Sequence, residues 1–426
     1  MYLLYSLLLA TGMIAASPYW LYLALQKRDF RASIPQRLGL RLTPFHAERR
    51  PVWLHAVSVG EVLAAKGLCR ALRQACPDTP LLVSTVTLTG HALAQKELSD
   101  AAQILYFPLD YSFSTRRFLS KLNPGLVIIM ETELWPNFLK ECARRDVPVS
   151  LANARMSDKS VRRYRHIRRM AGEMVRSLAR IGAQTQDDRK RFLAMGAVES
   201  QVVVTGNLKF DFPAQPIHCE SELLDLIRSA LSLQDGHPVV VMGSTRNGEE
   251  GLLLDQFMRL RRDLPSTKLI LAPRHPGRFD EVSQILDAAG VRWLRRTELG
   301  KSGQCPVDVL LLDSLGELRF VYSLATVAVI AGSFLPYGGH NLLEPAALGK
   351  PIVFGPEMSN FRELARLFLQ AQAARQCAAG ELASTLSGLL CNPEEADLLG
   401  RRAVQTYRAN QGATENTMKL VLPYIR

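Results

Sequence analysis

The chain has 426 residues, of which 47% are hydrophobic and 22% are charged, and its formal net charge is +12. This composition excludes a disordered or fibrous protein, and the length allows two ordinary domains plus a further segment. The positive charge indicates an anionic partner, which could be a phosphorylated substrate, anionic lipid or nucleic acid.

The first 25 residues contain no charged side chain and are followed at once by Lys27 and Arg28. An apolar stretch of this length suits a bilayer core, and it lacks the basic start of a cleaved signal peptide. We therefore predict a membrane anchor at 1–25, with a buried core helix as the alternative. The basic flank on its C-terminal side predicts a cytoplasmic catalytic body at the inner membrane. Whether the anchor spans the bilayer or lies in its interface stays open.

Residues 26–212 have the pattern of a doubly wound α/β domain, in which short apolar strands alternate with amphipathic helices. The predicted strands are 51–57, 81–85, 104–107, 126–130, 147–151, 180–185 and 202–205. A strongly basic helix is predicted at 156–179. Its apolar residues favour an anionic lipid surface over nucleic acid, because aromatic residues for base stacking are too few.

Four charged side chains follow strands of this domain. Glu61, after the first strand, is the candidate catalytic base, although the spacing Ser58-Val-Gly-Glu61 is also that of a capping box. Glu131 and Glu133 follow a later strand and could hold a metal, tune a base or cap a helix. The chain has no Asp-x-Asp and its histidines are scattered, so we expect no metal site. Lys209 could neutralise a phosphate or be a surface lysine.

The strand–helix rhythm restarts after 212–216, the predicted linker, and defines a second domain at 213–426. Its predicted strands are 239–242, 268–272, 291–294, 309–312, 326–331 and 351–354. Two long helices, 363–390 and 394–425, are expected to pack on this domain, with the last one crossing back to the first domain. Polar or glycine residues follow four successive strands, and the carboxyl ends of parallel strands line one crevice.

The glycine-rich stretch 332–361 is the strongest candidate for a nucleotide site. We expect a helix to begin near His340 or Asn341, where its N-terminus would suit a phosphate, and Glu344 could accept the hydroxyls of a ribose. Arg274 could bind a phosphate through two hydrogen bonds. Gly316 could bring backbone groups up to a base, and 359–361 could close the site.

These motifs together resemble those of the bacterial 3-deoxy-D-manno-octulosonic acid (Kdo) transferase family of lipid A biosynthesis, over nearly the whole chain. The segments that carry the resemblance are the apolar N-terminus, His55-Ala-Val-Ser-Val-Gly-Glu61, Met130-Glu-Thr-Glu-Leu-Trp-Pro-Asn137, Asn153-Ala-Arg-Met-Ser157, Gly206-Asn-Leu-Lys-Phe-Asp211, Pro273-Arg-His-Pro276, Leu315-Gly-Glu317 and Gly338-Gly-His-Asn-Leu-Leu-Glu344.

The resemblance implies a glycosyltransferase of the GT-B architecture, with two Rossmann-like domains facing a cleft. It implies transfer of Kdo from CMP-Kdo to the tetraacyl lipid A precursor with inversion, without cofactor or metal and without nucleic acid as a partner. Glu61 would be the general base, and Glu131 and Lys209 would assist the transition state. The residues that would bind CMP are Pro273, Arg274, Leu315, Gly316, Glu317, Asn341, Leu342, Leu343 and Glu344.

Two other functions stay open from the residues alone. One is a related two-domain transferase that moves a sugar from a UDP-sugar to a lipid. The other is a membrane-tethered nucleotide-binding protein without catalysis, in which Glu61 is only a helix cap.

Overall fold

The structure is a computed structural model that describes residues 2–42, 48–156, 164, 167–211, 221–233, 237–300 and 306–425. The chain folds into two compact units, Met1–Phe212 together with Asn410–Arg426, and Pro213–Ala409. The predicted linker and the first part of the predicted basic helix, 157–163, lie outside the described residues. The described part of that helix is α8 (Arg168–Arg176).

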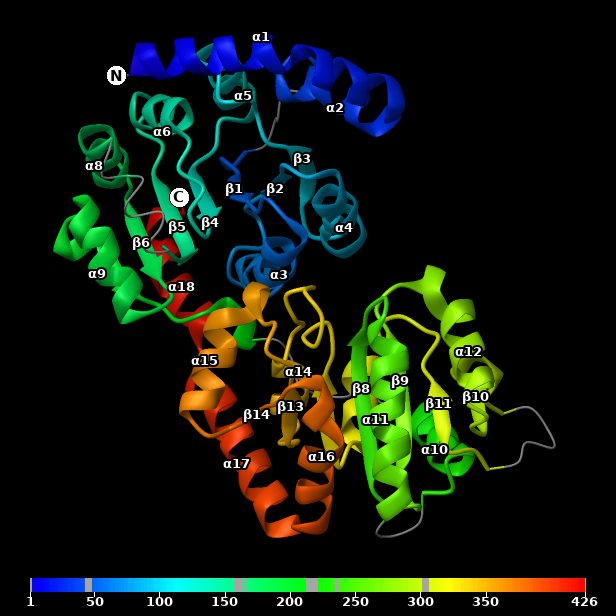
Figure 1. Cartoon of the computed structure of the whole chain (residues 1–426). Helices are drawn as coiled ribbons and strands as arrows, with labels where there is room; N and C mark the ends of the chain where they lie inside the picture. The colour runs from blue at the N-terminus through cyan, green and yellow to red at the C-terminus, as the bar shows by residue number, and fades with distance from the viewer. Residues whose placement is uncertain are drawn as a thin grey trace. The chain divides into compact units, whose positions relative to one another are not determined.

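A seven-stranded parallel sheet forms the centre of the first unit (Figure 1). Its strands are β1 (Val52–His55), β2 (Leu81–Thr85), β3 (Gln103–Tyr106), β4 (Leu126–Met130), β5 (Val149–Ala154), β6 (Arg180–Ala183) and β7 (Val202–Val204). The order β3-β2-β1-β4-β5-β6-β7 reverses direction between β1 and β4. Ligands of open α/β sheets bind at such a reversal, beyond the carboxyl ends of the strands. Every residue of β1, β2, β4 and β5 is buried, as expected for parallel strands covered on both faces.

The helices of the first unit connect these strands or cover the sheet. They are α1 (Tyr2–Gln26), α2 (Arg28–Arg37), α3 (Val59–Ala75), α4 (Leu88–Leu98), α5 (Ser112–Leu122), α6 (Pro136–Ala143), α8, α9 (Gln186–Met195) and α18 (Ala413–Val421). The sequence placed 410–426 with the second domain but expected the last helix to cross back to the first, and α18 does so by packing on α3, β5 and β6. Ala413, Met418 and Val421 are buried in the same apolar cluster as Leu54 and Leu68, which explains this return.

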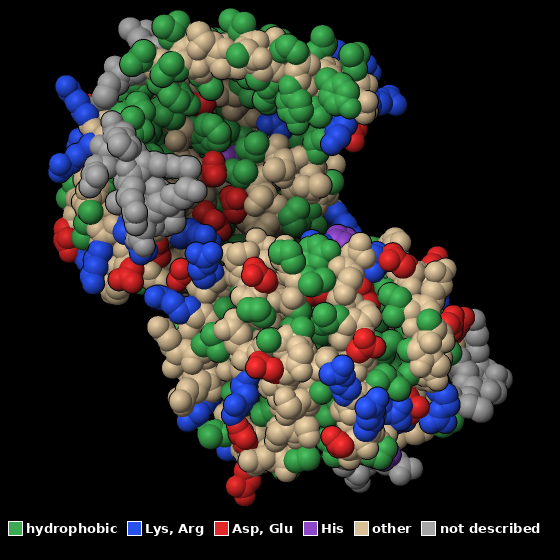
Figure 2. Space-filling view, viewed as in Figure 1, with side chains coloured by type: hydrophobic (Ala, Val, Ile, Leu, Met, Phe, Trp, Pro, Cys, Tyr) green, Lys and Arg blue, Asp and Glu red, His purple; other side chains and the backbone are tan. Residues whose placement is uncertain are grey.

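Helix α1 lies against its own unit along α6 and the start of α5 (Figure 1). The hydroxyl of Tyr5 donates a 3.0 Å hydrogen bond to Asp110, and Ser6 donates one of 3.3 Å to Asn137. The stretch Leu4–Leu23 is long and apolar enough to cross a membrane, and none of it is buried. Figure 2 shows hydrophobic side chains along this helix and basic side chains near the end of α2.

The second unit contains another seven-stranded parallel sheet, with the order β10-β11-β9-β8-β12-β13-β14. Its strands are β8 (Val239–Thr245), β9 (Lys268–Pro273), β10 (Trp293–Arg295), β11 (Val309–Leu311), β12 (Val327–Ile330), β13 (Ile352–Phe354) and β14 (Arg375–Gln376). Here the order reverses between β8 and β12. The loops after β8, β9, β11 and β12 therefore surround the expected ligand edge of this sheet.

The helices of the second unit differ from the predictions in three places. They are α10 (Ser221–Ala230), α11 (Glu249–Asp263), α12 (Phe279–Ala288), α13 (Leu318–Val321), α14 (Leu343–Ala347), α15 (Arg362–Gln370), α16 (Leu382–Cys391) and α17 (Pro393–Ala409). The helix predicted at 363–390 is wrong as one element, because Gln372 takes a left-handed φ of 49° and β14 follows it. The helix predicted at 394–425 is likewise broken, at Gly412 with φ 97°.

The third difference is α14, which begins at Leu343 rather than near His340 or Asn341 and spans five residues. Gly338 and Gly339 both have positive φ, so the chain before Asn341 is a turn and not a helix. The side chain of Asn341 accepts the N–H of Leu343 at 3.1 Å. The predicted helix start is therefore wrong by two to three residues, and Asn341 lies in the turn just before α14.

Candidate functional site

In the first unit, Glu61 lies in the first turn of α3, just beyond the carboxyl end of β1. Its carboxylate accepts the backbone N–H of Val57 at 2.9 Å and the hydroxyl of Ser58 at 3.0 Å. The Ser58 side chain does not cap the helix in return, so the reciprocal capping box is incomplete. Glu61 is only 8% exposed, and the two donors, Val57 and Ser58, hold its carboxylate in one orientation.

The surroundings of Glu61 favour its protonated form. Burial raises the pKa of Glu61 to about 7. The hydrogen bond from Val57 lowers this pKa, whereas the nearby charge of Glu131 raises it further. The charge of Glu133 acts in the same direction. A carboxylate whose pKa is close to neutral pH can take up and release a proton under physiological conditions, which suits a general base.

Glu131 and Glu133 follow β4, the strand beside β1 across the reversal of the sheet. Glu131 has a left-handed φ of 54°, and its N–H donates to the carbonyl of Ala152 at 2.9 Å. Burial and the charge of Glu131 raise the pKa of Glu133. Among the described residues, no cluster of three or more His, Cys, Asp or Glu side chains could hold a metal ion. The charge of Glu131 therefore lies close enough to raise the pKa of both Glu61 and Glu133.

Lys209 belongs to the short 3₁₀ helix η2 (Leu208–Asp211), which packs against α3. Asn153, at the end of β5, is fully buried with φ 56° and accepts the N–H of Leu208 at 3.0 Å. Asp211 accepts the N–H of Gly412 at 2.7 Å. Within the described part of the chain, the ammonium of half-buried Lys209 forms no ion pair. Asn153 thus fixes the turn that carries a lysine available to an anion.

In the second unit, the predicted CMP-binding residues follow three strands. Pro273 ends β9, and Arg274 comes directly after it, with an exposed side chain and its backbone N–H donated to Thr245 at 3.0 Å. Gly316 has φ 88° in the loop after β11, and Leu315 beside it is 64% exposed. An exposed leucine of this kind is available to the flat face of a base.

Glu317 is already engaged within its own unit. Its carboxylate pairs with the guanidinium of Arg296 through two hydrogen bonds, one of 2.6 Å from Nε, and it also accepts from Ser314. This carboxylate therefore shapes the 315–317 loop, and the groups left for a ligand there are backbone atoms and Leu315.

Glu344 lies in α14, after the strand β12, between the buried side chains of Leu342 and Leu343 and that of Pro345. Burial raises its pKa, and the charges of Arg319 and Arg274 and a hydrogen bond from Asn341 oppose this effect. Glu344 and Arg274 are therefore near neighbours although 70 residues apart in the sequence. A carboxylate beside a guanidinium offers both an acceptor for hydroxyls and a donor for a phosphate.

The sequence reasoning missed three residues at this edge. Arg246 follows β8 and contacts His275, and its guanidinium lies 5.1 Å from the ring centre of Tyr337. His340 packs against Gly332. Glu249 is fully buried and accepts the N–H groups of Gly332 at 2.6 Å and of Arg246 at 3.0 Å. An arginine directly after a strand was a signal that could have identified Arg246; nothing local predicts the long-range bonds of Glu249.

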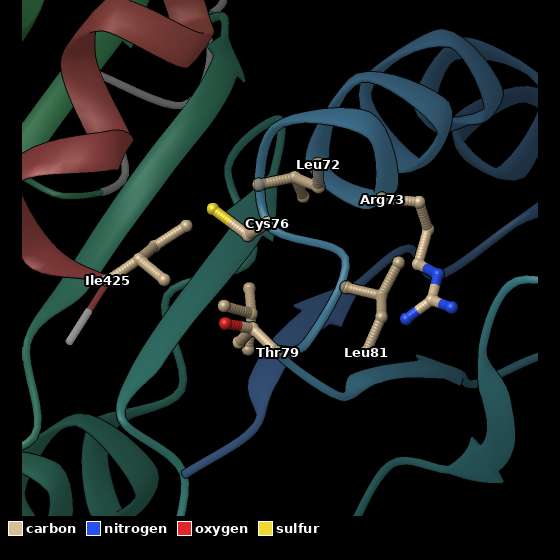
Figure 3. Close-up of a pocket in the computed structure, with 7 residues that line it drawn as sticks. Leu72, Arg73, Cys76, Thr79, Leu81 and Ile425 are labelled. Carbon is tan, nitrogen blue, oxygen red and sulfur yellow. The ribbon is translucent and has the colours of Figure 1, made fainter. Parts of the chain in front are cut away.

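A small cavity in the first unit lies away from these residues, at the amino ends of β1 and β2. It measures about 10 Å³ and is lined by Val52, Leu72, Arg73, Cys76, Thr79, Leu81 and Ile425 (Figure 3). This volume is room for about one water molecule. The hydroxyl of Thr79 is buried there without a partner among the described residues, and the cavity is too small for a sugar or a nucleotide.

Solved structures with similar folds include nucleotide-sugar enzymes. The UDP-GlcNAc 2-epimerase from Neisseria meningitidis, bound to UDP-GlcNAc, matches with a TM-score of 0.57 and 14% identity over 88% of this chain and 100% of that chain. A glycosyltransferase from Rickettsia africae matches with a TM-score of 0.57 and 12% identity over 88% of this chain and 98% of that chain. At these identities the likeness concerns the fold alone, which is of the GT-B type, with two α/β units.

Sequence comparison is more specific. The family model described as 3-deoxy-D-manno-octulosonic-acid transferase (kdotransferase) matches residues 32–212. The 3-deoxy-D-manno-octulosonic acid transferase of Haemophilus influenzae is 33% identical over 95% of this chain and 94% of its own length. That of Bordetella pertussis is 36% identical over 86% of each chain. Together with the two parallel sheets and the polar groups at their carboxyl edges, this similarity shows that the chain belongs to the 3-deoxy-D-manno-octulosonic acid transferase family of glycosyltransferases.

Proposed function

We propose that this protein transfers Kdo from CMP-Kdo to the tetraacyl lipid A precursor, lipid IVA, with inversion at the anomeric carbon and without a metal ion. Membership of the family supports Kdo transfer in lipopolysaccharide synthesis. The donor nucleotide, the acceptor and the stereochemistry go beyond that membership, and they are argued from the chemistry of the site.

The observation that carries the proposal is the position of Glu61, a buried carboxylate in the first turn of α3 beyond the end of β1, whose pKa burial raises to about 7. An acceptor hydroxyl must lose its proton as its oxygen bonds to the anomeric carbon of Kdo. Glu61 takes that proton. The bond from the anomeric carbon to the phosphate oxygen breaks on the opposite face, CMP leaves with the bonding electrons, and the configuration inverts.

The leaving CMP gains negative charge, which fixed positive groups stabilise without reorganisation. Arg274 binds the phosphate, and Lys209, which has no ion-pair partner among the described residues, assists the transition state. Glu131 assists by raising the pKa of Glu61. The nucleoside is bound by Glu344 and Asn341 and by the loop around Gly316. A single phosphate needs less neutralisation than a diphosphate, which is consistent with metal-independent transfer.

The lipid acceptor accounts for the apolar helix. We propose that α1 attaches the protein to the cytoplasmic face of the inner membrane and lies in the interface. Its contacts with Asp110 and Asn137, and the packing of Trp20 on Phe30 at 5.3 Å, hold it along its own unit. Its exposed hydrophobic side chains would then enter the lipid, while Lys27 and Arg28 meet anionic headgroups.

The test is to incubate the purified protein with CMP-Kdo and lipid IVA and to weigh the lipid product. We expect the mass of one or more Kdo units to be added, and Glu61→Gln to slow transfer by about 10²- to 10⁴-fold while still binding CMP. Near-normal turnover of Glu61→Gln would remove Glu61 as the base.

The donor is tested separately by competition. CMP should inhibit transfer and UDP should not; inhibition by UDP alone would favour the related transferase that uses a UDP-sugar. Arg274→Ala should weaken CMP binding by about 10- to 100-fold, the loss expected for a charged hydrogen-bond pair. Unchanged CMP affinity in Arg274→Ala would mean that the donor site is misassigned.

A further inference from the structure

Four cationic or imidazole side chains gather where β8, β9 and β12 end. Arg246 follows β8, Arg274 and His275 follow β9, and His340 lies in the glycine-rich turn after β12. Nη1 of Arg246 contacts Nε2 of His275. A Cβ atom built on Gly332 would lie 2.5 Å from the His340 ring and 3.6 Å from Cγ of Arg246, so these two side chains flank the same glycine.

Among the described residues, the two guanidinium groups of this cluster form no ion pair, unlike their neighbours. Other arginines of the same sheet edge are paired: Arg278 with Glu250 at 3.0 Å and Arg295 with Asp280 at 2.7 Å. Over the residues that the structure describes, neither Arg246 nor Arg274 forms an ion pair. Two unpaired guanidiniums at one sheet edge form a site that attracts anions.

Two atoms of the cluster are also buried without a hydrogen-bond partner in the described part of the chain, Nε of Arg246 and Nε2 of His340. Buried polar groups are nearly always satisfied, so a pair of unsatisfied nitrogens in one place calls for a ligand. Burial, together with the charges of Arg274 and Arg246, lowers the pKa of His340 to about 4. At neutral pH His340 is therefore uncharged and can donate one N–H.

The cluster is rigidly built. Glu249, which is fully buried, accepts the backbone N–H groups of Arg246, Gly332 and Phe334 at 3.0, 2.6 and 3.0 Å. Its oxygens therefore bond the backbone of both loops and are not paired with the guanidinium of Arg246. The ring of Tyr337 lies against that guanidinium, and the Tyr337 hydroxyl donates to the carbonyl of Asn247 at 2.9 Å. The guanidinium of Arg246 is therefore held in one position, where its N–H groups can bind a planar anion.

The order of the charged groups suggests how a donor would be oriented along the cluster. Glu344, the proposed ribose acceptor, is close enough to Arg319 and Arg274 for their charges to oppose the effect of burial on its pKa. A bound donor would then lie with its ribose at Glu344, its phosphate at Arg274 and its sugar toward Arg246. In CMP-Kdo the anomeric carbon of the sugar bears both a carboxylate and the oxygen that links the sugar to the phosphate. The donor thus has two anionic groups next to each other.

We propose that Arg246, with His340, forms a carboxylate subsite that is distinct from the phosphate-binding Arg274 and that selects donors whose sugar is a 2-keto acid. This inference rests on the proposed function, because it needs a CMP-linked acidic sugar in the second unit. It gives Arg246 a role in recognition of the sugar and none in recognition of the nucleotide.

The test compares two ligands, CMP and CMP-Kdo, by calorimetry on the full-length protein in detergent without acceptor. Arg246→Gln should weaken binding of CMP-Kdo by about tenfold or more and leave CMP affinity within about twofold. Arg274→Gln should weaken both ligands. Arg228→Gln, on α10, where Arg228 pairs with Asp225 at 2.7 Å, is the surface control and should change neither.

Retained CMP affinity also demonstrates that the Arg246→Gln variant is folded. If that variant loses its fold, Arg246→Lys provides the test. Lysine keeps the positive charge but cannot form two parallel hydrogen bonds, so this variant should bind CMP normally and CMP-Kdo several-fold more weakly. Equal weakening of CMP and CMP-Kdo, or no weakening of CMP-Kdo, would overturn the subsite. Failure of the wild-type protein to bind CMP-Kdo at all would instead overturn the proposed function, whatever the variants do.

Discussion

The backbone N–H of Val57 donates a 2.9 Å hydrogen bond to the carboxylate of Glu61, four residues further along the chain. This bond fixes the carboxylate at the start of α3, beside the charges of Glu131 and Glu133. The bond lowers the pKa of Glu61, while burial and the two neighbouring glutamates raise it, and the net result is a value of about 7. The residue is thus held like a helix cap but titrates like a catalytic base.

The rate of transfer should therefore depend on the ionisation of Glu61. We expect kcat/KM to rise with pH through an apparent pKa of about 7, because only the ionised carboxylate can accept a proton. Glu131→Gln removes a charge that raises this pKa, so the rising limb should move to lower pH. A pH–rate profile of both proteins, measured with saturating acceptor, checks this. A limb that stays in place in Glu131→Gln would contradict the coupling.

The free energy of unfolding should also depend on the ionisation of Glu61, but it should fall with pH where the rate of transfer rises. The unfolded chain releases this proton near the ordinary value of 4.5, whereas the folded protein holds it to about 7. Between those two values the folded state binds more protons, so the free energy of unfolding decreases as pH rises. Denaturation measured at pH 5 and pH 8 should show a smaller decrease for Glu61→Gln than for the wild type.

Asn153 is predicted to position Lys209 through the N–H of Leu208, and two substitutions separate this role from backbone strain. Asn153→Gly tolerates the φ of 56° but loses the hydrogen bond, and it should cost about 1–3 kcal/mol of stability and lower kcat. Asn153→Ala adds strain of about 1–2 kcal/mol to the same loss. Normal turnover in Asn153→Gly, with a defect only in Asn153→Ala, would mean that the hydrogen bond does not serve catalysis.

Glu249 joins the loop after β8 to the turn after β12, so its removal should damage both stability and donor binding. Glu249→Ala leaves the N–H groups of Gly332, Phe334 and Arg246 unsatisfied and should destabilise the protein by about 3 kcal/mol or more. Calorimetric melting and CMP titration measure the two effects. Glu394→Gln, an exposed position on α17, is the control. A melting temperature equal to that of the control would refute this role for Glu249.

The exposed face of α1 should govern membrane binding. Leu8 and Leu21 are 62% and 63% exposed, so replacing both with Asp puts charges into any lipid contact without disturbing the Tyr5–Asp110 bond. We expect the double variant to lose co-sedimentation with anionic vesicles, since each leucine that enters lipid contributes about 1.5–3 kcal/mol. Leu398→Asp, on α17 at 40% exposure, should sediment like the wild type. Equal sedimentation of the double variant would exclude α1 as the attachment.

The sequence alone predicted every strand of the described residues except the short β14, and it identified candidate site residues. Continuous apolar runs such as Leu126–Met130 identify buried parallel strands wherever they occur, because burial on both faces requires them. A glutamate after a strand, as at Glu61, and an arginine after a strand, as at Arg274, are local patterns that identify candidate site residues. The apolar composition of the first 25 residues is likewise a local pattern, and it predicts the membrane anchor.

The tertiary structure decided how these residues act. The pKa of Glu61 depends on Glu131 and Glu133, which follow a strand that is its neighbour only in the folded sheet. The bonds from Asn153 to Leu208 and from Glu249 to the turn at Gly332 join residues 55 and 83 positions apart. The break after Gln370 was set by packing that no local pattern encodes, and the apolar contacts that hold α18 on the first unit form only in the folded chain. Burial and charge depend on every neighbour in space, and those neighbours exist only once the chain has folded.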